Sequence, residues 1–405
     1  MQYKVIENGG VTSAAGYRAA GVACGIKDGK KKDLALVVSE RTAAAAGIFT
    51  RNVVKGHSLQ LTMEQLGKNR SADAVVVNSG CANACVGEAG EEAARQVVRH
   101  AAEILGTDPS RILINSTGVI GRVLDWKAAV RGLDLAKAQL SSEGGTCAEE
   151  AIMTTDTVKK EYAVCFQLEG KTVTIGGMAK GSGMIHPNMG TMISVITTDA
   201  DVSAEILQEA LRKVADSTYN RVSVDGDTSV CDMTVLLANG MAGNQKIDCR
   251  ESSACQLFTG MLHVVCEQLA RMLAKDGEGA TKLLEVQVVN CLDKDRAYQI
   301  ACAIAKSPLV KTAVFGQDAN WGRIITAAGY AGVEFDPNKV DVWIGDILTC
   351  KAGCAVDFDE GAALAVLRRS EVTVTVDFHD GSACERMWTC DFSYDYVKIN
   401  GSYRT

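Results

Sequence analysis

The chain has 405 residues, of which 47% are hydrophobic, and its formal net charge is −7. This apolar content predicts a large buried core and excludes a disordered chain, and the length predicts two or three domains. The acidic balance argues against the clustered Lys and Arg of a nucleic-acid-binding surface. The sequence also lacks the run of about 18 apolar residues that a membrane span requires, so we expect neither nucleic acid nor membrane as a partner.

Cysteine content is the most unusual feature of the composition, with fifteen cysteines and five histidines in the chain. Residues 1–7 do not resemble a signal peptide, because an acidic residue comes early and an apolar segment is missing. We therefore expect a cytoplasmic protein whose cysteines are mostly free, buried thiols. The pairs Cys81/Cys85 and Cys350/Cys354 do not have CxxC spacing and the histidines are scattered, so we expect no metal site.

Alternating strand and helix patterns run along the chain and predict an α/β or α+β fold. We expect elements in this order: strands at 33–38 and 74–77, a helix at 91–105, strands at 111–115, 161–167 and 171–175, helices at 204–214 and 253–273, a strand at 283–289, a helix at 293–305, a strand at 340–344, a helix at 361–368 and a strand at 372–378. Gly106 is a predicted helix C-cap and Ser203 a predicted N-cap. The strands around Gly170 are predicted to form a hairpin.

Residues 180–191 form a glycine-rich segment, Lys-Gly-Ser-Gly-Met-Ile-His-Pro-Asn-Met-Gly-Thr, and an apolar strand is predicted at 192–196. The segment lacks the third glycine of GxGxxG and fails the P-loop spacing, which argues against a nucleotide site. One interpretation of Gly190–Thr191 is an ordinary hairpin turn. The other is a cleavage site: the α-amine that cleavage would release is a base beside the hydroxyl of Thr191, which would make this threonine a nucleophile.

Four further positions suit a small-molecule site, and each also has an ordinary structural interpretation. Residues 115–118 are predicted to follow a strand and end in a glycine turn, which would suit an oxyanion hole or a simple strand-ending turn. Thr154 would contact a substrate or cap a local turn. Lys180 would bind a carboxylate or lie on the surface. Glu278, between two glycines, would meet an ammonium group or be an exposed turn acid.

Taken together and in this order, the segments resemble one family, the ornithine acetyltransferases. These are also called glutamate N-acetyltransferases, or the ArgJ family, of arginine biosynthesis. The matching segments cover nearly the whole chain and lie at 78–80, 82–85, 115–121, 152–157, 180–191, 223–229, 276–281, 307–312, 320–323 and 396–405. The sequence departs from the family at Cys81, where Asn is usual, and at 230–232, where Val-Cys-Asp replaces Thr-Asn-Asp.

The resemblance implies roles that the residues alone do not establish. It implies that Thr191 is the nucleophile, freed by self-cleavage after Gly190, and that Thr117 and Gly118 form the oxyanion hole. The residues that it implies for substrate binding are Thr154, Lys180, Thr191, Glu278, Asn400 and Thr405. Neither departure falls on these positions.

The resemblance also implies an α/β (α+β) layered sandwich of the DmpA/ArgJ-like type, similar to N-terminal-nucleophile enzymes and self-cleaved into two chains. Residues 1–190 would be the alpha chain and 191–405 the beta chain, with two of each forming a heterotetramer. Within the beta chain, 191–280 would complete the catalytic core and 281–390 a second, smaller domain. The tail at 391–405 would return to the active site.

The implied reaction is acetyl transfer from N2-acetyl-L-ornithine to L-glutamate through an acetyl-Thr191 intermediate, with ping-pong kinetics and no cofactor. The sequence leaves open whether acetyl-CoA is a second acetyl donor. Two other classes also stay open: an N-terminal-nucleophile aminopeptidase or amidohydrolase, which would give the acyl group to water, and a thiol-rich metal-binding protein.

Overall fold

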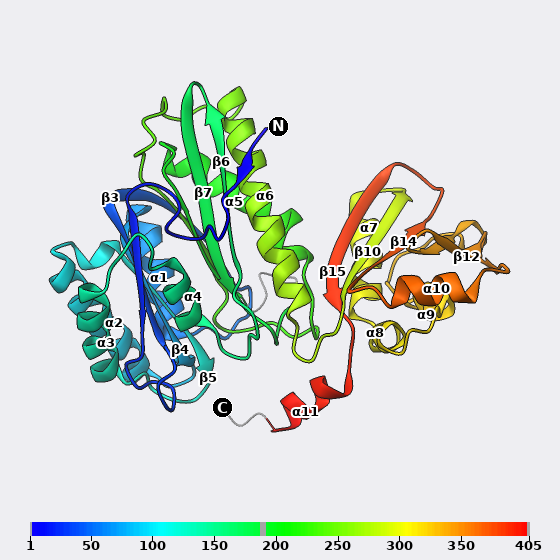
Figure 1. The fold of residues 1–405 in the computed structure, drawn as a ribbon, viewed down its shortest axis with the longest axis horizontal. Helices are drawn as coiled ribbons and strands as arrows, with labels where there is room; N and C mark the ends of the chain where they lie inside the picture. Colours follow the sequence, from blue (N-terminus) through cyan, green and yellow to red (C-terminus); the bar gives the residue numbers. More distant parts are fainter. Residues whose placement is uncertain (1, 187–191, 403–405) are drawn as a thin grey trace.

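The computed structural model describes residues 2–186 and 192–402, and it contains two β-sheets that lie side by side (Figure 1). Gly190, Thr191 and Thr405 lie outside the described residues. None of the helices in the described ranges combines the length and the apolar character that a membrane span requires.

The first sheet has nine strands in the order β1-β6-β7-β8-β9-β3-β4-β5, with β2 paired to β3. Its strands are β1 (Lys4–Val5), β2 (Tyr17–Val22), β3 (Leu34–Phe49), β4 (Ser71–Cys81), β5 (Ile112–Val119), β6 (Glu161–Leu168), β7 (Lys171–Lys180), β8 (Ile193–Thr198) and β9 (Met233–Ala238). The β8/β9 and β4/β5 pairs are parallel. Every residue of β8 and β9 is buried, which explains the largely apolar sequence of β9. The three polar residues of β8 are Ser194, Thr197 and Thr198, and each of their hydroxyls is hydrogen-bonded.

Helices cover both faces of this sheet, so that it forms the middle layer of a sandwich (Figure 1). These helices are α1 (His57–Asn69), α2 (Glu88–Leu105), α3 (Trp126–Ala138), α4 (Gly145–Ile152), α5 (Ala204–Ser217) and α6 (Ser253–Lys275). Successive side chains of a strand point to opposite faces. Accordingly, Ile196 of β8 belongs to the core formed with α6, whereas Val195 belongs to the core formed with α4.

The second sheet has six strands in the order β13-β12-β11-β14-β10-β15. Its strands are β10 (Leu283–Cys291), β11 (Asp341–Ile344), β12 (Ile347–Lys351), β13 (Cys354–Ala355), β14 (Glu371–Asp377) and β15 (Ala383–Cys390). The helices beside it are α7 (Lys294–Lys306), α8 (Pro308–Phe315), α9 (Trp321–Gly329) and α10 (Glu360–Leu367). This region has its own apolar core, to which β10, β14 and α7 all contribute.

Several contacts join the two regions, among them the following two. The guanidinium of Arg271 on α6 lies 2.6 Å from the carboxylate of Glu285 on β10. The backbone N–H of Ser223 donates to the carbonyl of Trp388 on β15 at 2.9 Å. After β15 the chain forms α11 (Tyr394–Ser402), which returns toward the first sheet (Figure 1). The turn after α6 and the helix after β15 therefore meet beside the first sheet.

Local signals in the sequence predicted many of these elements. The predicted helix at 91–105 is α2, and Gly106 caps it with a φ of 70°. Ser203 caps α5 by accepting from the N–H of Ile206, and the hairpin around Gly170 is formed by β6 and β7. The prediction for residues 115–118 was wrong: they do not follow a strand but lie within β5. This strand is longer than expected because its end pairs in register with the end of β4, Ser79 with Thr117 and Gly80 with Gly118.

Candidate active site

Six of the predicted site residues line one cavity of about 150 Å³. They come from five separate parts of the chain: Thr117 with Gly118, Thr154, Lys180, Glu278 and Asn400. The rest of the wall is formed by Ala82, Ile120, Thr155, Gly183, Met184, Ser229, Val230 and Cys231. The remaining predicted site residues, Gly190, Thr191 and Thr405, lie outside the described residues, so the structure does not place them.

Thr117 and Gly118 reach the cavity at the end of β5. Gly118 has a φ of 129°, in the region that favours glycine. A Cβ at this position would lie 2.4 Å from the backbone carbonyl carbon of Gly80 on β4. A larger residue would therefore push β4 and β5 apart, so close strand packing and backbone conformation both require glycine here.

Lys180 is the last residue of β7, and it is buried rather than on the surface. It pairs with Ile193, the first residue of β8. Because Lys180 also lines the cavity, the start of β8 lies beside the cavity wall. The N–H of Met192 donates to the Asp232 carboxylate at 2.9 Å, which fixes the chain at this point. The second oxygen of Asp232 has no hydrogen-bond partner among the described residues, and burial raises the pKa of this carboxyl well above its usual range.

Glu278 and Asn400 form the side of the cavity nearest the second sheet. Glu278 follows α6 in the turn at 276–279, and its N–H donates to the carbonyl of Ser182 at 2.8 Å. Its carboxylate accepts from the side-chain amide of Asn400 on α11 at 2.9 Å. A Cβ on Gly183 would lie 2.3 Å from this carboxylate, so the glycine makes room for it. Glu278 is thus a buried and oriented acid, not an exposed turn residue.

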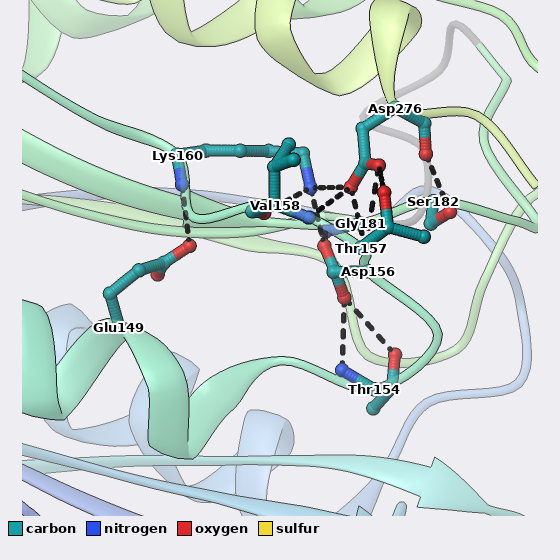
Figure 2. Close-up of polar contacts among 9 residues, drawn as sticks. All are labelled: Glu149, Thr154, Asp156, Thr157, Val158, Lys160, Gly181, Ser182 and Asp276. Carbon is teal, nitrogen blue, oxygen red and sulfur yellow. Dashed lines mark hydrogen bonds and ion pairs between the residues drawn. The ribbon is translucent and has the colours of Figure 1, made fainter. Parts of the chain in front are cut away.

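A buried network joins Thr154 to Gly181 and Ser182, the two residues that follow Lys180, and to Asp276, two residues before Glu278 (Figure 2). At its centre the Lys160 ammonium lies 2.7 Å from Asp156 and 2.6 Å from Asp276, and all three side chains are almost fully buried. Burial alone lowers the pKa of Lys160, but the two carboxylates outweigh burial and raise it. Burial opposes the charge of Asp156 as well, yet Lys180 and Lys160 hold its pKa well below the usual range. The Lys160 ammonium and the Asp156 carboxylate therefore both stay charged.

The cavity wall combines a cation, one acid and hydroxyls within a small volume. The Lys180 ammonium can bind a carboxylate, and Glu278 can accept hydrogen bonds from an ammonium group. Thr154 Oγ1 donates to the ionised Asp156 carboxylate at 3.5 Å, which leaves the lone pairs of this hydroxyl for an N–H group. Its volume is well below the roughly 300–1,000 Å³ of sites for drug-sized ligands. The site therefore suits a small amino-acid derivative.

Comparison with known proteins identifies the family. A family model described as "ArgJ family" matches residues 18–405. The chain belongs to the ArgJ family. It is 51% identical over 401 residues to the "Arginine biosynthesis bifunctional protein ArgJ" of Symbiobacterium thermophilum, covering 98% of this chain and 99% of that one. A protein of the same name from Caldanaerobacter subterraneus is 48% identical over 404 residues, covering 99% of this chain and all of the relative.

A solved structure agrees with this assignment. The crystal structure of the ArgJ protein from Bacillus halodurans is 44% identical to the matched part, with a TM-score of 0.51. The match covers 53% of this chain and 100% of that chain. The predicted family and the layered α/β fold class are both confirmed. So is the predicted enzyme class of this ArgJ chain, a glutamate N-acetyltransferase.

Several residues around the cavity were not predicted. Two of them are buried acids, Asp156 and Asp232, and the third is a buried lysine, Lys160. No local sequence pattern distinguishes these three from ordinary surface residues. The departures from the family at Val230 and Cys231 lie closer to the site than expected, because both residues line the cavity. Burial raises the pKa of the Cys231 thiol, which keeps it neutral.

Proposed function

We propose that this enzyme transfers the acetyl group of N2-acetyl-L-ornithine to L-glutamate through an acetyl ester on Thr191. The observation that carries the proposal is the single cavity lined by Thr117, Gly118, Lys180 and Glu278 beside the start of β8. Its charges fit both substrates, since each has a carboxylate for Lys180 and a nitrogen group for Thr154 or Glu278.

The proposed cycle begins with cleavage of the precursor. Thr191 Oγ attacks the carbonyl of Gly190, the peptide shifts to an ester, and water hydrolyses this ester. The products are residues 1–190 and 191–405, the second with a free α-amine at Thr191. The Bacillus halodurans chain supports this division by its length, because 53% of 405 residues is about 215, and 405 − 190 is also 215.

In the transfer itself, the α-amine takes the proton of Thr191 Oγ while the oxygen attacks the acetyl carbon. An α-amine has a pKa of about 7.7–8.0, so a useful fraction is neutral near pH 7. The N–H of Gly118 and the hydroxyl of Thr117 stabilise the oxyanion, each by about 3 kcal/mol. Ornithine leaves with the proton on its nitrogen. The amine of glutamate then attacks the acetyl ester, which gives N-acetylglutamate and restores Thr191.

Further parts of the proposal concern donors, assembly and compartment. The residues of the cycle all belong to this chain, and we propose no dissociable cofactor. The relatives are named bifunctional, which supports acetyl-CoA as a second acetyl donor for glutamate. We also propose a heterotetramer of two alpha and two beta chains in the cytoplasm, where its fifteen cysteines would stay reduced.

Intact mass spectrometry tests the processing step. The wild-type protein should give two masses that correspond to residues 1–190 and 191–405. Thr191→Ala should give one uncleaved mass, whereas Thr191→Ser keeps a hydroxyl and should still cleave. A Thr191→Ala protein that is cut at the same bond would overturn self-processing by this residue.

The acceptor assay tests the transfer step. Purified enzyme with N-acetylornithine should form N-acetylglutamate in proportion to the glutamate added, with parallel lines in a double-reciprocal plot. Release of free acetate as the main product would instead identify a hydrolase of the aminopeptidase or amidohydrolase kind.

Thr117→Ala should slow cleavage and transfer together, since both steps pass through an oxyanion. Stoichiometric zinc in the purified protein would point to the metal-binding alternative.

A further inference from the structure

The network behind the cavity joins three segments that are far apart in the sequence. Asp156 accepts hydrogen bonds from the N–H of Thr154 at 2.9 Å and from the N–H of Gly181 at 2.6 Å. It therefore fixes one substrate-facing residue directly and the residue after Lys180 as well. Figure 2 shows these contacts meeting at the same carboxylate.

Asp276 holds the third segment. Its carboxylate accepts from the N–H and the hydroxyl of Thr157, and its backbone carbonyl accepts from Ser182 Oγ at 2.6 Å. Glu278 lies two residues further along, with its N–H on the carbonyl of Ser182. Lys160 is the group that binds Asp156 and Asp276 at once. Its own N–H donates to the buried Glu149 at 3.0 Å, which anchors the lysine to α4 (Figure 2).

We infer that Lys160 and Asp156 are positioning residues of the acetyl-transfer site. They hold Thr154, Lys180 and Glu278 in fixed positions relative to one another. Lys160 does not line the cavity, so it acts through these three residues and not by touching substrate. This inference rests on the proposed function for its kinetic readout, but its structural part can be tested without any activity.

The network also sets the charge that a substrate meets. The positive charges of Lys180 and Lys160 both lower the pKa of the Asp156 carboxyl. Without Lys160, Asp156 would lose the cation that contacts it, and its carboxylate would compete with the substrate carboxylate for Lys180. Loss of Lys160 should therefore weaken binding of both substrates, because ornithine derivatives and glutamate each bring a carboxylate to Lys180.

A second buried pair provides a matched control. Lys282 is buried and lies 3.8 Å from Asp391, whose carboxylate also accepts from the N–H and the hydroxyl of a threonine, Thr281. This arrangement repeats the one at Asp276 and Thr157, but neither Lys282 nor Asp391 lines the cavity. Lys282→Met should thus destabilise the fold in a similar way without moving the substrate-facing residues.

The kinetic test compares Asp156→Asn, Lys160→Met and Lys282→Met, each after intact mass has shown the same processing as wild type. Asp156→Asn is nearly isosteric, so it should fold even if Lys160→Met does not. We expect the KM for N-acetylornithine and for glutamate to rise about 10- to 100-fold in Asp156→Asn and Lys160→Met, with a smaller change in kcat. Lys160→Arg keeps the charge and should recover part of this loss. KM values within twofold of wild type in Asp156→Asn, or the same rise in Lys282→Met, would overturn the inference.

Hydrogen exchange gives a readout that does not depend on the reaction. In Asp156→Asn the amides of Thr154 and Gly181 should exchange faster together, and in Lys160→Met the amide of Thr157 should join them. In Lys282→Met only the amides near Asp391 should change. Independent exchange of these three segments in the Lys160 variant would refute the positioning role. If the wild-type enzyme transferred no acetyl group, the proposed function would fall while this measurement still decided the structural inference.

Discussion

Lys160 and Lys311 are both completely buried, yet their surroundings have opposite effects on their charge. Lys160 contacts two carboxylates, which raise its pKa against the effect of burial. Lys311, on α8, donates to the carbonyl of Val224 at 2.6 Å and to the hydroxyl of Thr389 at 2.7 Å, and its ammonium lies 4.2 Å from the ring centre of Phe392. Burial therefore prevails at Lys311 and lowers its pKa.

The difference shows that depth alone does not decide what a buried lysine does. Lys160 balances charge, because removing it leaves the buried carboxyl groups of Asp156 and Asp276 without the cation that contacts them. Lys311 is mainly a donor that links the segment at Val224 to the end of β15 and the start of the tail that leads to α11. The first lysine belongs to the candidate active site and the second to the junction between the two sheets.

The largest effect on stability should come from Lys160→Met. With no lysine between them, Asp156 and Asp276 become uncompensated buried charges, and we expect a loss of about 3–5 kcal/mol in the free energy of unfolding. Urea denaturation measures this loss. Adding Asp276→Asn to the same chain should recover part of it. A loss below about 1 kcal/mol would mean that water or another cation already compensates these carboxylates.

Lys311→Met should cost less than Lys160→Met. No ion pair of this ammonium occurs among the described residues. The variant therefore leaves the carbonyl of Val224, the hydroxyl of Thr389 and the sulfur of Cys390 without this donor, at about 1–3 kcal/mol. The same urea experiment measures both variants side by side. Equal losses in the two variants would contradict the distinction drawn between charge balance and hydrogen bonding.

The two lysines should also give opposite pH dependences. The raised pKa of Lys160 contributes stability that is fully present below the unfolded value of about 10.4 and is lost as the pH rises through the folded value. The lowered pKa of Lys311 means that its penalty is relieved as the pH rises toward about 10.4. Stability measured from pH 8 upward should therefore show the advantage of wild type over Lys311→Met growing with pH. Its advantage over Lys160→Met should shrink at the alkaline end, and parallel curves would refute this assignment.

The smallest effect should come from Lys159→Met, next to Lys160 in the sequence. The Lys159 ammonium lies 3.4 Å from Glu150, and both side chains are more than 40% exposed. Exposed pairs of this kind contribute about 0–1 kcal/mol. A loss as large as that of Lys160→Met would show that general charge, and not the buried network, accounts for the effect.

The two adjacent lysines also show how far the sequence can predict the site. Helix caps such as Ser203 and the hairpin around Gly170 follow from local patterns, and the structure contains both. The contact of Lys160 with Asp276 joins residues 116 positions apart, and nothing local marks which lysine of the pair is buried. Likewise, the extension of β5 through Gly118 depends on β4, a strand that the sequence predicted to end at residue 77.

The resemblance to a family supplied what local patterns did not. Residues 115–118, Lys180 and Glu278 each had an ordinary interpretation that pattern alone could not exclude. Their convergence on one cavity depends on the packing of β5, β7 and the turn after α6. A buried lysine at a strand end and a buried turn acid contradict composition-based expectations, because such residues are usually exposed.

The order of strands in the first sheet has a consequence for assembly. β8 and β9 come after residue 191, yet they lie between β7 on one side and β3 on the other, which both come before residue 190. Each half of the chain therefore supplies a strand edge that the other half must cover, and two ladders must break at once to separate them. Expressed apart, the halves should expose these edges and aggregate, whereas a cut between residues 190 and 191 leaves the sheet closed. The proposed cleavage would therefore break one covalent bond and leave the two halves held together by the shared sheet.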